Sequence, residues 1–151
     1  MDAKDYATVD DVRGVYLRDA GLLAMEREIA RVIRARQPLV LAFVEVEHLQ
    51  AINGSRGQTA GHRILLDVAS TLRTNLRSYD LIIRYGEDEF ICVIPGMHIA
   101  EAPKCFGFIK TALEEAPGHG SVSIGFAELQ PDDSAELLVA RAATARHRER
   151  Q

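Results

Sequence analysis

The sequence predicts an α+β fold of the ferredoxin-like kind, in which helices pack on a largely antiparallel sheet. The first observation is the order of its apolar patterns: helix, strand, helix, two strands, helix, strand and helix. The second is that the two central strands are joined by a turn so short that they must pair as a hairpin. The third is the length of 151 residues, which suits one domain with one sizeable core.

The first half of the chain alternates helix, strand and helix. Four apolar residues at helical spacing follow Asp19, a good N-cap, and predict a helix over 19–36: Leu22, Met25, Ile29 and Val32. The run "PLVLAFVEVE" at 38–47 is β-branched and apolar, which predicts a buried strand. The amphipathic pattern of "GHRILLDVASTLRTNL" predicts a second helix over 61–76.

The second half begins with the hairpin. Its strands are "YDLIIRY" at 79–85 and "EFICVIP" at 89–95, with Gly86 in the turn. The segment "HIAEAPKCFGFIKTALEEA" at 98–116 predicts a helix, in which Pro103 either kinks the first turns or marks the true start. A strand "GSVSIGFAEL" and a last helix "SAELLVARAATARHRE" complete the order.

Composition excludes several classes of protein. The net charge of −4 gives no general attraction to nucleic acid. The two cysteines, Cys92 and Cys105, form no disulfide framework or zinc motif, which favours a reducing compartment. No apolar run approaches the length of a membrane span, and the N-terminus does not have the pattern of a signal peptide. We therefore expect a cytoplasmic protein with no nucleic-acid or membrane partner.

Three consecutive acids follow Gly86 between the hairpin strands: Glu87, Asp88 and Glu89. If the hairpin lies beside the strand at 38–47, Glu45 and Asp88 converge, and converging carboxylates repel unless a proton or cation lies between them. Mg²⁺ prefers oxygen ligands and commonly binds one or two carboxylates together with substrate phosphates. The pattern indicates either a metal-assisted phosphate site or a solvated turn whose acids point into water.

The segment "RYGEDEF" at 84–90 resembles the signature of the GGDEF family, the diguanylate cyclases. Three further segments resemble motifs of that family in the same order: "DDVRGVYLRD" at 10–19, "EVEHLQAINGSRGQTAGH" at 45–62 and "SVSIGFA" at 121–127. The segment "RSYD" at 77–80 matches the family's RxxD inhibitory-site motif at the usual offset from Gly86. The resemblance covers nearly the whole chain and implies the palm-like fold of the nucleotidyl cyclases.

The resemblance implies bacterial signalling by cyclic di-GMP, which the family makes from two GTP molecules with Mg²⁺ in two facing domains. It implies Glu45 and Asp88 as metal ligands, and Asp88 and Glu89 as catalytic acids. It implies five nucleotide-binding positions: Asn53, His62, Gly86, Glu87 and Arg148. It also implies that Arg77 and Asp80 bind cyclic di-GMP at the inhibitory site.

Plainer roles stay open for some of these residues. Asn53 is also a suitable cap for the turn "INGSRG". Arg77 and Asp80 also suit a local ion pair, which is worth little at a surface. Arg18 is placed either to orient the N-terminal segment against the hairpin or to do nothing specific.

Three positions depart from the family pattern. Glu45 replaces an Asp and is one methylene longer, and Mg²⁺ tolerates poor octahedral geometry badly. Glu87 replaces the second glycine of the signature, so a negative side chain stands where the triphosphate must approach. His62 replaces the Asp that pairs with guanine. Gly86 is kept, and we expect it to supply the positive φ of a type II′ turn.

These departures favour a degenerate GGDEF domain that acts as a cyclic di-GMP receptor or a regulatory interaction module. The retained acids keep open an active diguanylate cyclase, or a cyclase with altered base preference. A dimerisation domain that binds no nucleotide is the third alternative, and a homodimer is expected only by analogy. We divide the chain into an N-terminal segment, residues 1–18, and a single GGDEF-like domain, residues 19–151.

Overall fold

The computed structural model describes residues 12 and 14–150, and for residues 147–150 the backbone alone. Its elements in chain order are β1 (Val15–Tyr16), α2 (Arg18–Ala35), β2 (Leu39–Val46), α3 (Leu49–Arg56), α4 (Gln58–Asn75), β3 (Leu81–Gly86), β4 (Glu89–Pro95), the 3₁₀ turn η1 (Ile99–Glu101), α5 (Ala102–Glu115), β5 (Val122–Glu128) and α6 (Ala135–Arg150). Asp10 and most of the segment 1–18 lie outside the described residues. The predicted α+β fold is confirmed.

The sheet has five strands in the order β1-β3-β4-β2-β5. All neighbours pair antiparallel except β1 and β3, which are parallel. Without β1, the spatial order of the four strands is the order of a ferredoxin-like β-α-β-β-α-β unit, as predicted from the sequence. The strand β2 pairs with β4 on one side and β5 on the other, so the end of β2 lies between two strands from the second half of the chain.

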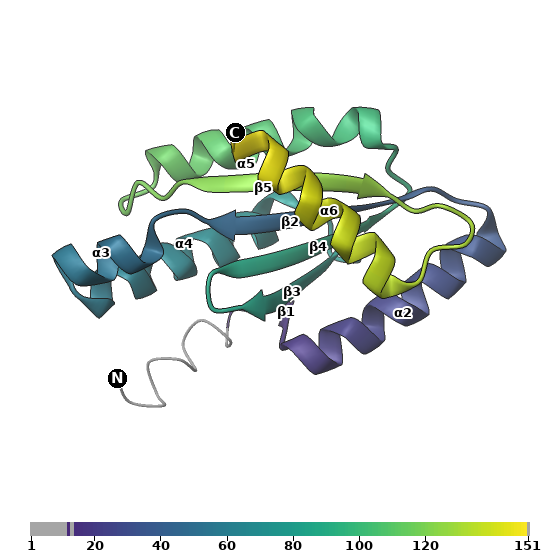
Figure 1. Cartoon of the computed structure of the whole chain (residues 1–151), viewed down its shortest axis with the longest axis horizontal. Helices are drawn as coiled ribbons and strands as arrows, with labels where there is room; N and C mark the ends of the chain where they lie inside the picture. Colours follow the sequence, from purple (N-terminus) through teal and green to yellow (C-terminus); the bar gives the residue numbers. More distant parts are fainter. Residues whose placement is uncertain (1–11, 13, 151) are drawn as a thin grey trace.

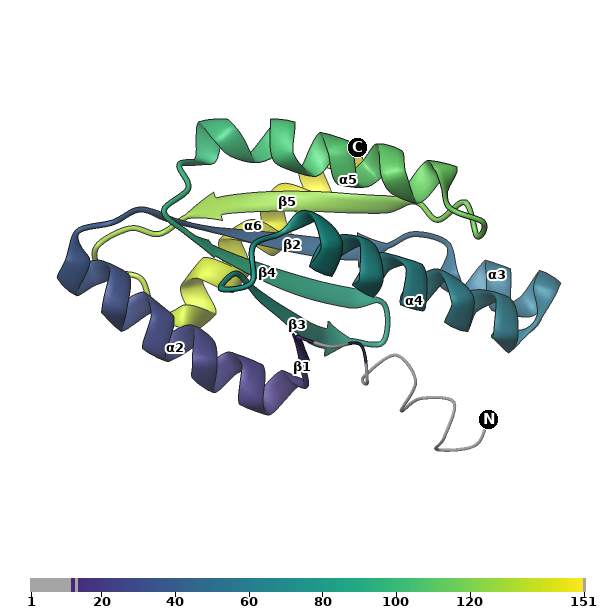
Figure 2. The ribbon, with the colours of Figure 1, turned by 180° about the vertical axis from the view of Figure 1, so that it is seen from behind.

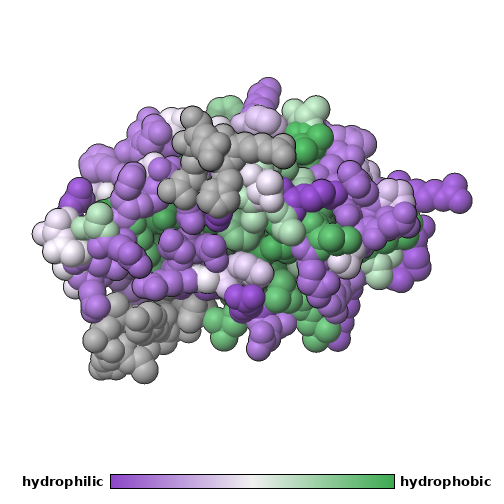
Figure 3. All heavy atoms as spheres, in the orientation of Figure 1, coloured by the Kyte–Doolittle hydropathy of each residue, from purple (hydrophilic) through white to green (hydrophobic). Residues whose placement is uncertain are grey.

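Helices cover both faces of the sheet (Figure 1). Because side chains alternate along a strand, β2 gives Val44 and Val46 to a core beneath α4 and α5, and Leu41 and Phe43 to a core beneath α2 and α6. Figure 2 shows α4 and α5 on the face opposite α2 and α6. Apolar side chains reach the surface in a band between α2 and α6 (Figure 3).

Local details differ from the sequence expectations in two places and confirm one of two alternatives in a third. The helix α3 was not predicted, because it is short and buries only Leu49 among the described residues. Asp19 lies inside the first turn of α2, and the N-cap is Leu17, so Asp19 acts on the helix dipole and is not the cap. Pro103 lies in the first turn of α5, which confirms that it marks the helix start.

No helix among the described residues is both long and apolar enough to cross a bilayer.

Candidate functional site

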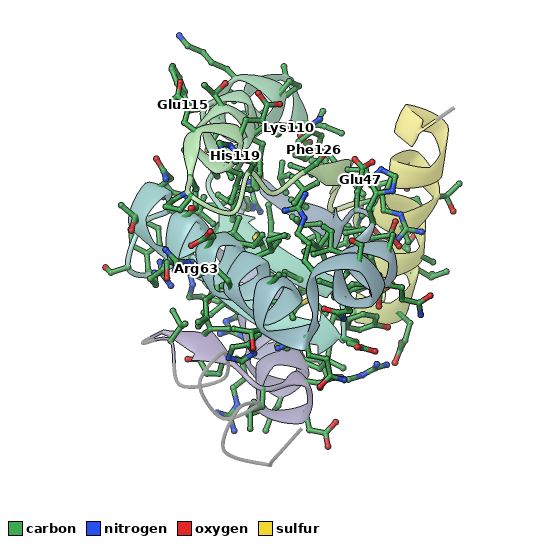
Figure 4. All side chains as sticks on the ribbon, turned by 90° about the vertical axis from the view of Figure 1, so that its left-hand side faces the viewer. Glu47, Arg63, Lys110, Glu115, His119 and Phe126 are labelled. Carbon is green, nitrogen blue, oxygen red and sulfur yellow. The ribbon has the colours of Figure 1, made fainter. Side chains whose placement is uncertain are left out.

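The predicted convergence of acids at the end of β2 is confirmed. Glu45 pairs with Glu89 across β2 and β4, and the Val46 amide donates to the Asp88 carbonyl at 2.8 Å. Carboxylate oxygens of Glu45, Asp88 and Glu89 all lie within 4.8 Å of one another. Figure 4 looks onto this end of the molecule, with Glu47 labelled close to α6 and Arg63 on α4. We call these three side chains the acidic cluster.

The acids of β2 and β4 lie on the face that α6 covers. Glu45 pairs with Glu89 on one side and with Ser123 on the other, so these three residues form a row across three strands. All are half-buried or buried. Alternation puts the row on the same face as Phe43, which packs beneath α2 and α6. The β-strand geometry, and not a loop, therefore fixes two of the three acids.

Gly86 has a different role from the one expected. Gly86 pairs with Glu89 at the end of the hairpin, and its φ is not positive. The prediction of a type II′ turn with Gly86 at its first central position is therefore wrong. A Cβ at Gly86 would collide with the Glu89 carboxylate, so the glycine leaves room for that side chain.

Glu87 is the exposed residue at the tip of the hairpin, where it and Asp88 are the two turn residues. Neither has a positive φ, so an ordinary residue fits this turn without strain. The Arg84 side chain donates to the Gly86 carbonyl at 2.8 Å and to the Glu87 carbonyl at 2.6 Å. The turn backbone is thus held from within, and the Glu87 side chain projects from it.

One residue at the acidic cluster was missed by the sequence analysis. Arg146 of α6 places Nη1 3.4 Å from Glu45 Oε2 and 3.7 Å from Glu89 Oε2. Only 7% of Arg146 is exposed, and its guanidinium lies 5.0 Å from the centre of the Phe43 ring. Its place in the polar tail of the last helix gives no sequence signal for burial, because only the tertiary fold brings it over β2.

Electrostatics at the cluster disfavour the charged form of Glu89. Burial is the main cause that raises the pKa of Glu89, and the neighbouring Asp88 charge raises it further. Arg146 opposes this shift through its positive charge. The protein thus holds partly buried carboxylates close together, and a nearby cation stabilises them.

The oxygen donors of the acidic cluster suit Mg²⁺, but the buried arginine beside them does not. Opposite ligands of one Mg²⁺ lie about 4.2 Å apart, close to the spread of the cluster. The Arg146 guanidinium already lies against two of the three acids. The residues as arranged therefore do not fit a bound divalent cation. Arg148, predicted at the nucleotide, lies on α6, but its side chain is outside the described residues.

A second group of polar atoms lies between α3 and α4. Asn53 Oδ1 and His62 Nε2 are buried and have no hydrogen-bond partner within the part of the chain that the structure describes. A Cβ at Gly61 would collide with Asn53 Oδ1, so the glycine lets this side chain lie against α4. The Asn53 side chain caps nothing, and only its backbone carbonyl accepts a bond, from the Gly57 amide at 3.0 Å. Unpaired buried polar atoms are costly and are typical of a site that a ligand completes.

Arg77 and Asp80 bind each other within the "RSYD" turn, and Arg73 of α4 donates to the carbonyls of both. The Asp80 carboxylate, 2% exposed, accepts from the Arg77 amide at 2.7 Å and from the Arg77 Nε and Nη2 at 3.1 and 2.9 Å. Arg77 also donates to the Pro95 carbonyl at 2.7 Å and lies 4.5 Å from the centre of the Tyr79 ring. This arrangement is stronger than the exposed (i, i+3) pair considered from the sequence, because the carboxylate is buried.

Arg77 faces a shallow hollow on the surface. The hollow measures about 420 Å³ and is lined by Arg77, Tyr79, Arg31, Glu28, Gln37, Pro95 and Gly96. The exposed part of the Arg77 guanidinium, an aromatic ring and a second arginine therefore meet at one place. Arginines bind phosphate and aromatic rings stack on bases, so the hollow has the groups that recognise a nucleotide.

Arg18 contacts the other side of the hairpin. Its Nη1 donates to the Tyr85 carbonyl at 3.0 Å, and its guanidinium lies 4.1 Å from the centre of the Tyr85 ring. The first of the two roles considered for Arg18 is therefore confirmed: it orients the start of α2 against the hairpin.

Comparison with known proteins gives a consistent result. Residues 7–151 match the family described as diguanylate cyclase, GGDEF domain. The chain is 28% identical over 154 aligned residues to diguanylate cyclase DgcP of Pseudomonas aeruginosa, with 97% of this chain and 23% of that protein covered. It is 34% identical over 122 residues to diguanylate cyclase DosC of Escherichia coli K12, with 76% of this chain and 26% of that protein covered. The chain thus spans about a quarter of the length of these relatives.

Among solved structures, the GGDEF domain of DgcB from Caulobacter crescentus in complex with c-di-GMP has a TM-score of 0.83. The identity is 22%, and the match covers 89% of this chain and 84% of that one. At this identity the likeness shows the fold, which agrees with the palm predicted from the sequence.

Proposed function

Because the chain belongs to the GGDEF family of diguanylate cyclase domains, we propose that it is a catalytically impaired member that acts as a cyclic di-GMP receptor or regulatory interaction module in cyclic-dinucleotide signalling. Its relatives are named as diguanylate cyclases, and a structural neighbour binds c-di-GMP. In this proposal the chain binds cyclic di-GMP but has lost most of the cyclase activity.

The observation that carries the receptor proposal is the preformed Arg77 turn. The buried Asp80 carboxylate fixes the Arg77 guanidinium, so little side-chain entropy is lost when a phosphate binds to it. Tyr79 and Arg31 line the same hollow. In this arrangement Asp80 positions Arg77, and direct contact of Asp80 with guanine requires Arg77 to move first.

Two features support impaired turnover. Glu87 projects a negative side chain from the hairpin tip, on the phosphate side that the family resemblance implies. Arg146 lies against the acids that would hold Mg²⁺. Phosphoryl chemistry depends on positioning and charge neutralisation, so a misplaced metal costs most of the rate. We therefore propose that Mg²⁺ binds weakly at best and that Glu45, Asp88 and Glu89 are vestigial acids.

The test is a calorimetric titration of the chain with cyclic di-GMP in EDTA. We expect binding by the wild type, loss of binding in Arg77→Ala, and no change in Arg63→Ala. Arg63 is a matched control, since it is an exposed arginine whose Nε lies 3.6 Å from Asp67, one helical turn away. Equal affinity of the wild type and Arg77→Ala would refute the assignment to this turn. No binding at all would favour the dimerisation domain without nucleotide.

One observation favours the second candidate function, a cyclase with altered base preference. Asn53 Oδ1 is an acceptor, and His62 Nε2 is a donor or an acceptor depending on its tautomer; both are buried and unpaired. Asn53 Oδ1 lies against Gly61, the residue before His62, so we propose that one purine edge binds both side chains. Incubation with GTP or ATP and Mg²⁺, followed by chromatography of cyclic dinucleotides, distinguishes this function, because the receptor proposal predicts no product.

We also propose a cytoplasmic location and a homodimer. Cys92 and Cys105 are both free, and burial raises the pKa of each thiol, which suits a reducing cytoplasm. A homodimer would bring two such domains face to face, as the family reaction requires. Analytical ultracentrifugation with and without cyclic di-GMP tests for it.

A further inference from the structure

The acidic cluster is contacted by a cation that belongs to the protein itself. Arg146 lies 101 residues from Glu45 in the chain, and its Nη1 lies 3.4 Å from Glu45 Oε2 and 3.7 Å from Glu89 Oε2. The Arg146 side chain is 9% exposed. It therefore differs from a surface arginine that samples many rotamers.

The backbone of α6 holds Arg146 in this place. A Cβ at Gly125 of β5 would collide with the Ala142 carbonyl and the Arg146 amide, so α6 lies directly on the strand at this point. The guanidinium also lies over the Phe43 ring, 5.0 Å from its centre. Backbone contact and ring contact together confine the arginine to the space above the acids.

Charge balance alone would allow a metal and the arginine together. Three ionised carboxylates and one guanidinium leave two negative charges, which one divalent cation would neutralise. Geometry decides against it. Mg²⁺ binds oxygens at about 2.0–2.1 Å and needs near-octahedral space for its remaining ligands, which are usually waters. Nη1 lies 3.4 and 3.7 Å from oxygens of two of the three carboxylates that would bind such an ion.

We propose that Arg146 fills the cation position of the acidic cluster and excludes divalent metal from it. The guanidinium supplies the countercharge that the family obtains from a metal, and it does so permanently, because it comes from a packed helix. Two of the three acids thereby have a countercharge that comes from the protein itself. The inference goes beyond the receptor proposal, since the Arg77 turn is a separate site.

The Nε atom of Arg146 indicates that packing, and not optimal hydrogen bonding, determines where this side chain lies. Nε is buried and has no hydrogen-bond partner among the described residues, although an arginine that binds a carboxylate with both nitrogens of its fork would satisfy it. The contacts to Glu45 and Glu89 are made through Nη1 alone. Such a group stays in place through packing and long-range charge, and its removal leaves a ready set of oxygen ligands.

The experiment uses Mn²⁺ alone, titrated into nucleotide-free protein and followed by EPR of the free ion. We expect no saturable Mn²⁺ site in the wild type at the cluster. Arg146→Met keeps the bulk and removes the charge, and it should raise Mn²⁺ affinity by about tenfold or more, the scale on which outer-shell groups change metal binding. Adding Glu45→Gln should abolish the gain.

The control is Arg141→Met on the same helix. Arg141 pairs with Asp133 at 2.7 Å, away from the acids, so this variant should bind Mn²⁺ like the wild type. Equal Mn²⁺ affinity of the wild type and Arg146→Met would overturn the proposal, as would an equal gain in Arg141→Met.

A measurement on the wild type guards against a variant that fails to fold. In NMR spectra with Mn²⁺, the amide signals of Glu45, Asp88 and Glu89 should not be broadened selectively. Selective broadening there would overturn the proposal whatever the variants do. Neither measurement involves a nucleotide, so the result is independent of cyclic di-GMP binding.

Discussion

The acidic cluster and the Arg77 turn both join an arginine to carboxylates, but they leave different groups for a ligand. At the turn, partners three residues apart make three short bonds, and the guanidinium keeps 44% of its side chain exposed. At the cluster, partners 101 residues apart meet through one nitrogen, and the arginine is buried. The arginine of the Arg77 turn therefore presents its positive charge to the solvent. The arginine at the acidic cluster instead neutralises carboxylates inside the protein.

This difference in exposure determines which of the two sites can bind a ligand. A guanidinium that a buried carboxylate has fixed from behind can accept a phosphate in front without further ordering. A guanidinium enclosed by a helix, a ring and two acids has no free face. Four substitutions, in descending order of expected effect, test this contrast between the two sites.

Gly125→Ala should have the largest effect, and only on the cluster side. The new Cβ would collide with backbone atoms of α6, at the Ala142 carbonyl and the Arg146 amide, so the helix must move. We expect a loss of about 3 kcal/mol in the free energy of unfolding, since overpacking against backbone cannot be relieved by a rotamer change. Urea denaturation measures it.

The control for Gly125→Ala is Gly107→Ala on α5, where no atom lies within 4 Å of the new Cβ. There we expect a gain of about 0.5–1 kcal/mol, because alanine is the better helix former. If both substitutions changed stability equally, α6 would not be held on β5 at that point.

Asp80→Asn should have the next largest effect, on the turn side. Asparagine keeps the shape but loses the charge that binds Arg77, and charge-assisted hydrogen bonds contribute about 1.5–3 kcal/mol each. Because half of Arg77 is exposed, we expect a net loss of about 2 kcal/mol in the free energy of unfolding. Cyclic di-GMP affinity should fall too, since Arg77 is released.

The matched control is Asp67→Asn, whose partner Arg63 is more exposed and lies at 3.6 Å. Because the partner arginine is 58% exposed and lies 3.6 Å away, this control should change stability by less than about 1 kcal/mol, although the Asp67 side chain itself is only 17% exposed. If Asp80→Asn lowered the free energy of unfolding but left the cyclic di-GMP affinity unchanged, Asp80 would stabilise the fold without positioning Arg77 for the ligand. That result would contradict the positioning role of Asp80.

Glu87→Gly should change stability only slightly and tests whether the hairpin tip or the cluster closes the nucleotide site. The turn needs no positive φ, and Arg84 holds its carbonyls, so the fold should survive with a loss of at most about 1 kcal/mol from added backbone entropy. Removing the charge should improve GTP binding in Mg²⁺. Adding Arg146→Met should improve it further.

Adding His62→Asp to Glu87→Gly should shift preference from ATP toward GTP by restoring an acceptor for guanine. Isothermal titration with both nucleotides measures these changes. Unchanged GTP binding in folded Glu87→Gly, together with a gain in Arg146→Met, would show that the arginine alone closes the site.

The sequence predicted a largely antiparallel sheet of the ferredoxin-like kind and, for neighbouring strands, the meeting of Glu45 with Asp88, because strand periodicity and a short hairpin turn are strong local signals. It did not predict α3, which has little apolar periodicity. It also gave Gly86 the wrong role, because a glycine needed for space and one needed for positive φ look alike in a sequence. The incorrect prediction of a type II′ turn followed from this error.

Arg146 could not be predicted for a different reason. Its contacts depend on how α6 crosses β5 and on a glycine 21 residues earlier in the chain, and neither is visible in a local pattern. The Arg77 turn, in contrast, lies within four consecutive residues, so a motif was enough to find it. A site formed by consecutive residues can be predicted from the sequence, whereas an ion pair between distant residues can be identified only from the fold.

The smallest expected effect is the pH dependence of Glu89, which tests how completely Arg146 neutralises the cluster. Burial, and after it the Asp88 charge, raise the pKa of Glu89 in the folded protein. A raised pKa means that the folded state binds the proton more tightly than the unfolded state does. The contribution of Glu89 to stability is therefore fully present below the unfolded pKa of about 4.3 and is lost as pH rises through the folded value.

Glu89→Gln removes this titration, so the variant should gain stability relative to the wild type between pH 4 and pH 7, and the two should converge in acid. Urea denaturation across this range, with the exposed Glu115→Gln as control, measures the difference. A difference that stayed constant with pH would mean that Arg146 offsets the desolvation of Glu89 in full. In that case the cluster would be as well satisfied as the Arg77 turn, and the contrast between the two sites would lie in exposure alone.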